Sequence, residues 1–435
     1  IYLGNMDALE LIKTKVATSG ATLDQIQNAG ALERLRLLNM GPAMDGANGA
    51  GGKLHMIRPA ADSAVPWTAL VVGLWIPNFF YWGLNQYIMQ RTLAAKSLTE
   101  GQRGIVFAAF LKLIIPFVVV IPGIMAYNMY SGDLQHNASK KNAAIIEQYQ
   151  ADASVLVPFT ENFAKLYPDQ SAEIFAHNAA AANVLNAVAP ADFKDLCAAN
   201  NRIVEDGVKA GGKNATKLVG YDYDSAFPVL LNNLIKPVHG LTWFVLAAIF
   251  GAVVSTLASM LNSASTLFTM DIYGRLFRRK AAQTELVVVG RTCVAVFMLI
   301  ACLLAPSLNN PQWGGVFQFI QEFQGFVSPG VLAVFIFGFF SPRTPRYGGW
   351  LGILANVVIY GGLKLFASDV AFLNRMAISF ALVCAVLGLI TLLNPMRKPV
   401  VLPQNAKLNM TSSRSVVWVG AAVCILTVAL YIIFW

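Results

Sequence analysis

Eight apolar runs, each long enough to cross a lipid bilayer, constrain the fold of this chain more than any other feature. A helix needs about 20 mostly apolar residues to span the hydrocarbon layer. Only 13% of the 435 residues are charged, about half the share that soluble domains carry. The sequence therefore predicts an all-α polytopic membrane protein, with spans at residues 66–90, 104–127, 239–270, 285–306, 316–341, 348–366, 374–394 and 415–434.

Lysine and arginine residues gather in alternate loops between these runs. The loops at 91–103, 271–284, 342–347 and 395–414 are basic, whereas 307–315 and 367–373 contain no lysine or arginine. Because positive loops stay in the cytoplasm, residues 1–65 and 128–238 are predicted to be extracytoplasmic. We expect a multi-pass protein of the plasma (inner) membrane, with the lipid bilayer as a partner. The net charge of +9 follows from this topology and does not indicate a nucleic-acid partner.

The runs and loops predict five successive segments. An outer N-terminal segment precedes two spans that include a broken helix, and an enlarged extracytoplasmic segment of short helices separates these from three core and three accessory spans. The boundaries are 1–65, 66–127, 128–238, 239–341 and 342–435.

The first span carries the stretch "NFFYWGLNQYIMQR" at residues 78–91, which is unusually polar for a membrane helix. Pro77 lacks an N–H and frees backbone carbonyls, which predicts a break in the helix. Asn78 and Tyr81 are three residues apart and therefore share a face. Broken helices at the bilayer midplane commonly form substrate sites in transporters, and this use is favoured. A proline kink packed against neighbouring helices is the alternative.

Lys112 lies deep in the second span, within "FAAFLKLIIPF". An ammonium group is costly there and normally faces a bundle interior or an aqueous cavity. The alternative is that the Lys112 side chain extends to place its ammonium at the membrane–water interface. A functional role is favoured, because Lys112 lies too far from the end of the helix for this. Its donors could bind hydroxyl groups or a carboxylate.

A stripe of polar side chains runs along the third span at Ser255, Ser259, Asn262, Thr266 and Thr269. Small hydroxyl residues let helices approach closely and hydrogen-bond across the gap. They also offer the hard oxygen ligands that suit an alkali cation, and spacing alone does not decide between these two roles.

The fifth span opens with Gln321 and Glu322. A neutral amide is cheaper to bury than a carboxylate, so Gln321 is the better candidate for a ligand contact. We expect Glu322 to face water or a basic partner. Because the sequence contains no metalloprotease motif, nucleophile elbow or Cys/His metal cluster, it does not indicate an enzyme.

These residues together resemble the sodium/solute symporter family, and most of all its sodium/sugar branch, which includes bacterial sodium/galactose and animal sodium/glucose transporters. The motifs are "YWGLNQYIMQRTLAAKS", "FLKL", "PFVVVIPG", "STLASMLNSASTLFTMDIY" and "FQFIQEFQGFVSPG". The resemblance covers most of residues 60–395 except the long outer segment. It implies the leucine-transporter-type fold of two inverted five-helix repeats. In this chain the second repeat and accessory helices would be present, and the first repeat would precede Ile1 and be missing.

The resemblance also implies roles for individual residues. It makes Asn78 a sugar-hydroxyl ligand, Tyr81 the aromatic that closes the site toward the cytoplasm, and Trp82 its packing support. Lys112 and Gln321 match two further hydroxyl partners. The implied sodium ligands are the carbonyl of Ala252 and the hydroxyls of Ser255 and Thr256.

The implied function is sodium-coupled symport of a galactose- or glucose-like sugar, or of a polyol, by alternating access. A family member for another solute, such as myo-inositol, a carboxylate or an amino acid, is the nearer alternative, and a non-transporting solute sensor is the other. The chain departs from the family at Pro77 and in its long segment 131–225. Since half of the implied site would be absent, we expect these residues alone not to transport.

Overall fold

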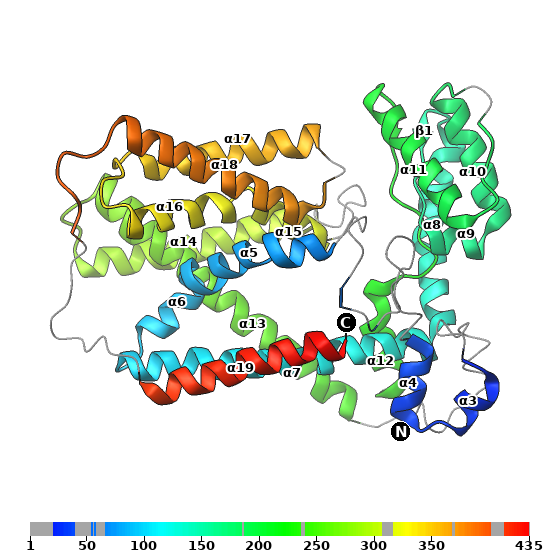
Figure 1. The fold of residues 1–435 in the computed structure, drawn as a ribbon, viewed down its shortest axis with the longest axis horizontal. Helices are drawn as coiled ribbons and strands as arrows, with labels where there is room; N and C mark the ends of the chain where they lie inside the picture. The colour runs from blue at the N-terminus through cyan, green and yellow to red at the C-terminus, as the bar shows by residue number, and fades with distance from the viewer. Residues whose placement is uncertain are drawn as a thin grey trace. The chain divides into compact units, whose positions relative to one another are not determined.

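The computed structural model describes residues 21–39, 54, 56–57, 66–184, 187–235, 240–306, 316–367, 370–401 and 413–434. The chain forms two compact units (Figure 1). Unit 1 comprises 1–41, 116–249 and 304–318, and unit 2 comprises 42–115, 250–303 and 319–435. Each unit has its own buried clusters of side chains, so each is described by itself.

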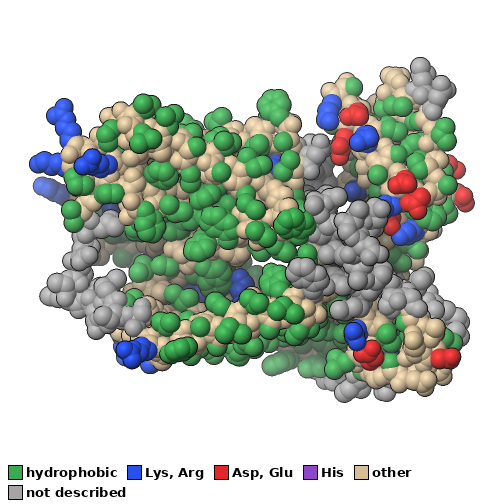
Figure 2. All heavy atoms as spheres, in the orientation of Figure 1, with side chains coloured by type: hydrophobic (Ala, Val, Ile, Leu, Met, Phe, Trp, Pro, Cys, Tyr) green, Lys and Arg blue, Asp and Glu red, His purple; other side chains and the backbone are tan. Residues whose placement is uncertain are grey.

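Seven described helices are long and apolar enough to cross a membrane, and an eighth apolar helix, Ala69–Leu84, is shorter. They match the eight predicted runs one for one. Hydrophobic side chains cover much of the visible face of these helices, as Figure 2 shows. The seven longer spans are α7 (Leu98–Met129), α13 (Leu241–Leu267) with its π-helical extension η4 (Phe268–Phe277), α14 (Gln283–Leu304), α15 (Val316–Gly325) together with α16 (Ser328–Phe340), α17 (Gly348–Phe366), α18 (Phe372–Leu393) and α19 (Arg414–Ile433).

Helices α16, α17 and α18 pack against one another in unit 2. Leu332, Ala333, Val383 and Leu387 are buried between them. The helices approach closely at Gly330, where an added Cβ would lie 2.6 Å from the Cβ of Asn356. A larger residue there would force α16 and α17 apart.

The first span consists of η1 (Ala69–Gly73), α5 (Trp75–Phe79), η2 (Phe80–Leu84) and α6 (Gln86–Leu93), and both η segments are π-helical. The span is broken as predicted, within the stretch 77–86, but the break is not at Pro77, which lies inside α5. The ring of a proline clashes with the carbonyl four residues earlier, here that of Gly73. Gly73 ends the widened π-helical segment η1, in which Leu74 N–H bonds to the Ala69 carbonyl. The wider turn lets the helix continue past the proline.

The actual break is at Asn85, whose backbone is extended (φ −76°, ψ 120°). Its side chain accepts a hydrogen bond from Tyr87 N–H at 3.1 Å. Asparagine is a favoured N-cap because its short side chain satisfies a helix N–H that lacks a backbone partner. Asn85 therefore ends the first half of the span and starts α6.

The fifth span is also broken, between α15 and α16. Phe326 and Val327 donate their N–H groups to the carbonyls of Phe323 and Gln324, three residues back. Tight turns of this kind close a helix end, and the next helix begins at Ser328, with Pro329 in its first turn. The apolar run at 316–341 predicted one uninterrupted span.

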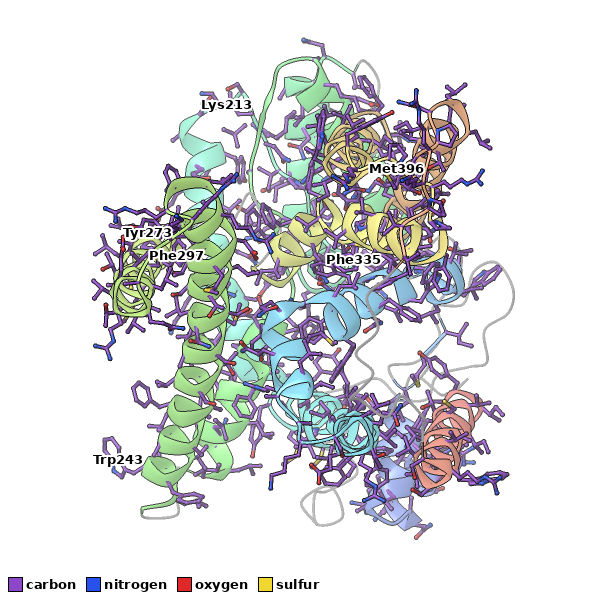
Figure 3. The ribbon with its side chains drawn as sticks, turned by 90° about the vertical axis from the view of Figure 1, so that its left-hand side faces the viewer. Lys213, Trp243, Tyr273, Phe297, Phe335 and Met396 are labelled. Carbon is purple, nitrogen blue, oxygen red and sulfur yellow. The ribbon has the colours of Figure 1, made fainter. Side chains whose placement is uncertain are left out.

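The hairpin of η4 and α14 also lies in unit 2. Phe268 meets Phe297 edge to face at 6.1 Å, and Tyr273 Oη donates to Glu285 Oε1 at 2.6 Å. Figure 3 labels Tyr273 and Phe297, which lie near each other on this hairpin. These contacts join α13 and its extension η4, which carry the row of polar side chains, to α14.

Unit 1 is built mainly from the long segment that the sequence predicted to be short helices. Its helices enclose Phe159, Phe163, Ile174 and Leu218, and two short parallel strands pair Val155 with Lys213. The elements are α3 (Leu23–Asn28), α4 (Ala31–Asn39), α8 (Ser131–Ala151), β1 (Val155–Leu156), α9 (Glu161–Leu166), α10 (Pro168–Ala181), α11 (Phe193–Lys209), β2 (Lys213–Asn214), η3 (Tyr223–Ser225) and α12 (Ala226–Leu234).

Several buried polar groups in unit 1 are paired. Asn178 accepts from Val157 N–H at 2.9 Å and donates to the Val157 carbonyl at 2.7 Å. At the surface, hydrogen bonds from Lys213 and Ser154 lower the pKa of Asp152. Burial raises the pKa of Tyr223 to about 12. These contacts help to hold the helices and loops of unit 1 together.

Candidate functional site

An aromatic pair and a lysine meet in unit 2, between η2 and α7. The rings of Tyr81 and Trp82 are perpendicular, with centroids 5.7 Å apart. Lys112 Nζ lies 4.7 Å from the Trp82 centroid and 5.9 Å from the Tyr81 centroid. An ammonium group at this distance is attracted by the negative face of an aromatic ring. The structure therefore brings together three of the five residues expected to bind a solute.

Asn78 lies one helical turn before Tyr81, and its side chain is exposed. Its Nδ2 donates to the carbonyl of Leu74 at 2.8 Å. This bond leaves the side-chain oxygen directed away from that carbonyl, with further capacity to accept hydrogen bonds. Asn78 can therefore offer polar contacts from the same segment that carries the aromatic pair.

Gln321 is not brought into contact with these groups. Among the described residues, it makes no hydrogen bond or ring contact with Asn78, Tyr81 or Lys112. It lies on α15, one residue before Glu322, whose carboxylate contacts two basic side chains. The expectation that Glu322 has a basic partner is thus confirmed.

The three residues expected to bind sodium lie on one face of α13. Thr256 Oγ1 donates to the Ala252 carbonyl at 2.9 Å, and Ser255 is exposed. A hydroxyl bonded to the carbonyl four residues earlier is common in helices. The same arrangement also places a carbonyl and hydroxyl oxygens side by side, as an alkali cation requires.

The rest of the polar stripe divides between two roles. Thr266 Oγ1 donates to the Asn262 carbonyl within its own helix, whereas Ser259 receives hydrogen bonds from α6. Arg91 donates to Ser259 Oγ at 2.8 Å, and Gln90 Nε2 does so at 3.5 Å. The stripe therefore serves in part to join α13 to the first span.

Arg91 was predicted to lie in a cytoplasmic loop, but it is part of α6. Its guanidinium also lies 5.4 Å from the Tyr87 ring, and Tyr87 is 6.5 Å from Tyr81, centroid to centroid. A continuous set of contacts thus leads from the aromatic pair to Ser259 on α13. The charge of Arg91 in the sequence indicated topology and gave no sign of this role.

The described helices and this constellation define a multi-pass, all-α membrane protein. Residues 205–356 match the model of the sodium:solute symporter family. The resemblance to this family that the sequence motifs predict is thereby confirmed.

Individual relatives agree with the family match. The chain is 38% identical over 307 residues to the sodium/glucose cotransporter of Vibrio parahaemolyticus, an alignment that covers 71% of this chain and 43% of the relative. It is 29% identical over 305 residues to sodium/glucose cotransporter 2 of Rattus norvegicus, covering 70% of this chain and 35% of the relative. Sodium/myo-inositol cotransporter 2 of Sus scrofa is similar at 29% identity, over 70% of this chain and 34% of the relative. The chain thus spans less than half the length of these relatives.

Proposed function

We propose that the protein carries sodium and a sugar-like solute together across the plasma membrane by alternating access. One observation carries the proposal. The contacts from Tyr81 through Tyr87 and Arg91 to Ser259 connect a segment rich in hydrogen-bonding side chains with the helix that bears the candidate cation ligands. Coupled transport needs such a link, because binding of one ligand must change the affinity for the other.

The proposed solute ligands are Asn78, Tyr81, Lys112 and Gln321, with Trp82 as packing support. The amides and the phenol can both donate to and accept from hydroxyl groups, and the ammonium can donate to them. An aromatic face can pack against the apolar face of a sugar ring. The cation–π contacts of Lys112 hold its ammonium beside the aromatic pair, which supports a place for it in the site.

The proposed sodium ligands are the Ala252 carbonyl and the hydroxyls of Ser255 and Thr256. Oxygen ligands suit hard cations, and the 2.9 Å contact between Thr256 and Ala252 keeps two of them together. Sodium is here a transported substrate. Its binding would favour the state in which the solute site is formed, so that both ligands load before the helices rearrange.

The wider architecture is part of the same proposal. We infer an inverted-repeat fold of the leucine-transporter type, with spans from 66–127 and 239–341 forming a repeat and 342–435 forming accessory helices. Segments 1–65 and 128–238 would be extracytoplasmic. The positive-inside pattern of the loops supports this orientation, and the broken first span supports its place at the substrate site.

A polyol is a second candidate solute, because one of the similar proteins is named a sodium/myo-inositol cotransporter. A carboxylate or an amino acid is less favoured. The ammonium of Lys112 could pair with a carboxylate, but the joint presence of Asn78, Tyr81, Lys112 and Gln321 suits a solute with several hydroxyl groups better. A sensor that binds solute without moving it is the remaining alternative.

The test is uptake of labelled galactose and glucose into proteoliposomes that contain the full-length protein. Accumulation that requires an inward sodium gradient would establish symport, and myo-inositol in parallel would rank the solutes. If a folded protein bound a sugar but moved none, with or without sodium, the transport proposal would be wrong and a sensor would be favoured.

A further inference from the structure

An ion cluster, largely buried at Glu322 and Arg375 and exposed at Lys364, joins α15 to the two helices that follow α16. Arg375 Nη2, on α18, donates to Glu322 Oε1 at 2.7 Å, and Lys364 Nζ, on α17, lies 3.1 Å from Glu322 Oε2. The side chains of Arg375 and Glu322 are only 6% and 13% exposed. Removing two charges from water is costly unless each keeps a well-placed partner. The carboxylate of Glu322 is therefore confined to one direction, toward α17 and α18.

The same two helices also hold the C-terminal end of α15. Asn356 Nδ2, on α17, donates to the carbonyls of Phe326 at 2.6 Å and Gly325 at 3.3 Å, where the fifth span breaks. Ser379 Oγ, on α18, donates to Asn356 Oδ1 at 2.7 Å. These bonds satisfy carbonyls that the break leaves without helical partners. Both the middle and the end of the short helix are thus fixed to α17 and α18.

Gly325 allows the closest of these contacts. A Cβ at this position would lie 2.1 Å from a ring carbon of Tyr360, which is fully buried. The Tyr360 ring in turn packs edge to face against Phe326 at 4.9 Å, and the Arg375 guanidinium lies 5.9 Å from its centroid. The aromatic ring, the ion pair and the helix break form one packed unit.

We propose that Glu322, held by Arg375 and Lys364, is a positioning residue that sets the direction of Gln321. Successive side chains on an α-helix are separated by about 100° of rotation, since one turn takes about 3.6 residues. When Glu322 is fixed toward α17 and α18, the rotation of α15 is fixed, and Gln321 must point to a different side. This inference rests on the proposed function, in which Gln321 contacts the solute.

The first test compares Glu322→Gln with the unchanged full-length protein in proteoliposomes. The change keeps the size of the side chain but removes the charge that Arg375 and Lys364 hold. We expect the KM for galactose at saturating sodium to rise by about tenfold, because small misplacements of a contact group weaken productive binding strongly. Sodium binding without sugar, followed by tryptophan fluorescence, should not change. A folded variant with an unchanged sugar KM overturns the proposal.

The matched control is Asp271→Asn, which removes another acid–base pair in unit 2. Asp271 lies 3.7 Å from Arg275, and both side chains are largely exposed. The sugar KM and sodium binding should both stay as in the unchanged protein. If this control raised the sugar KM as much as Glu322→Gln does, the effect would reflect lost charge in general and the positioning role would be refuted.

A second variant covers the case in which Glu322→Gln does not fold. Arg375→Lys keeps the positive charge but loses the planar guanidinium that fits a carboxylate. We expect a smaller rise in the sugar KM in the same direction. No change in KM in a correctly folded protein would again overturn the proposal.

A labelling experiment tests the position of α15 without relying on transport. The native cysteines, which include five in these 435 residues, are replaced, Gln321→Cys is introduced, and the rate of reaction with a membrane-impermeant maleimide is measured. Adding Glu322→Gln should change this rate several-fold, while Asp271→Asn should not. An equal rate with and without Glu322→Gln refutes the positioning role. If the unchanged protein showed no sodium-driven uptake, the proposed function would fail, yet labelling would still decide whether Glu322 orients residue 321.

Discussion

Asn356 is expected to contribute more to the stability of unit 2 than any of its single hydrogen bonds suggests. Its amide is fully buried and contacts the carbonyls of Gly325 and Phe326 and the hydroxyl of Ser379. Asn356→Ala removes the partner of the Phe326 carbonyl and of the Ser379 hydroxyl. A buried polar group left without a partner costs about 1–3 kcal/mol. Two such groups are left without a partner, and the more distant Gly325 carbonyl adds a smaller loss. We therefore expect Asn356→Ala to lower the free energy of unfolding by about 3–4 kcal/mol.

Ser379→Ala provides the comparison, because it leaves only Asn356 Oδ1 without its donor. We expect a loss of about 1–2 kcal/mol from this change alone. In the Asn356→Ala background the same change should cost almost nothing, since the serine hydroxyl has already lost its partner. The interaction energy between the two positions should therefore be about 1–2 kcal/mol, well above the roughly 0.5 kcal/mol scatter of independent sites.

The free energy of unfolding is measured by equilibrium titration with a denaturing detergent in mixed micelles, for the unchanged protein, both single variants and the double variant. Additive losses at the two positions, or a loss below about 1 kcal/mol for Asn356→Ala, would show that the amide does not hold the break. Gly338→Ala on α16 is a suitable control, because no atom lies within 4 Å of an added Cβ there.

Four further predictions concern single side chains. Lys112→Ala should raise the sugar KM by about tenfold, a loss of about 1.4 kcal/mol, in uptake assays at saturating sodium; an unchanged KM would remove Lys112 from the site. Thr256→Ala should raise the half-saturating sodium concentration more than it changes sugar recognition, and the reverse order would contradict the cation assignment. Tyr360→Phe should leave thermal stability unchanged or slightly higher, because the buried hydroxyl makes no hydrogen bond with the described residues; a loss above about 1 kcal/mol would reveal a partner. Lys213→Gln should let Asp152 protonate at a higher pH, because Lys213 lowers its pKa. A depressed folded-state pKa stabilises the fold above the ordinary aspartate pKa and loses that effect as pH falls, so thermal melting of the variant at neutral and acidic pH should show a smaller pH dependence than the unchanged protein.

The sequence predicted the membrane spans well, because a long apolar run has few stable alternatives to a membrane helix. It also singled out Lys112, Tyr81 and Trp82, because charged groups and hydrogen-bonding groups deep in such runs are costly without a partner. The structure brings these residues within cation–π distance. Their roles as ligands stay predictions.

Other features depend on information that local sequence does not carry. Pro77 suggested a break, but a widened turn upstream accommodates it, and the chain breaks at Asn85. The partners of Glu322 lie 42 and 53 residues further along the chain, at the ends of two other apolar runs. Only the packing of α15 against α17 and α18 shows that these charges belong together. The available sign in the sequence of a role for Glu322 was its position directly after Gln321, a candidate ligand.

The π-helical segments of the first span change how its side chains should be scanned. Over η1 and η2 each turn holds more residues than the 3.6 of an α-helix, so a face deduced from α-helical spacing drifts along 69–84. A mutational scan of this stretch should show a repeat longer than that of α17 or α18. One residue deleted from either segment would restore an α-helical turn and rotate everything beyond it. Such a deletion is expected to be less tolerated than most substitutions in the same stretch.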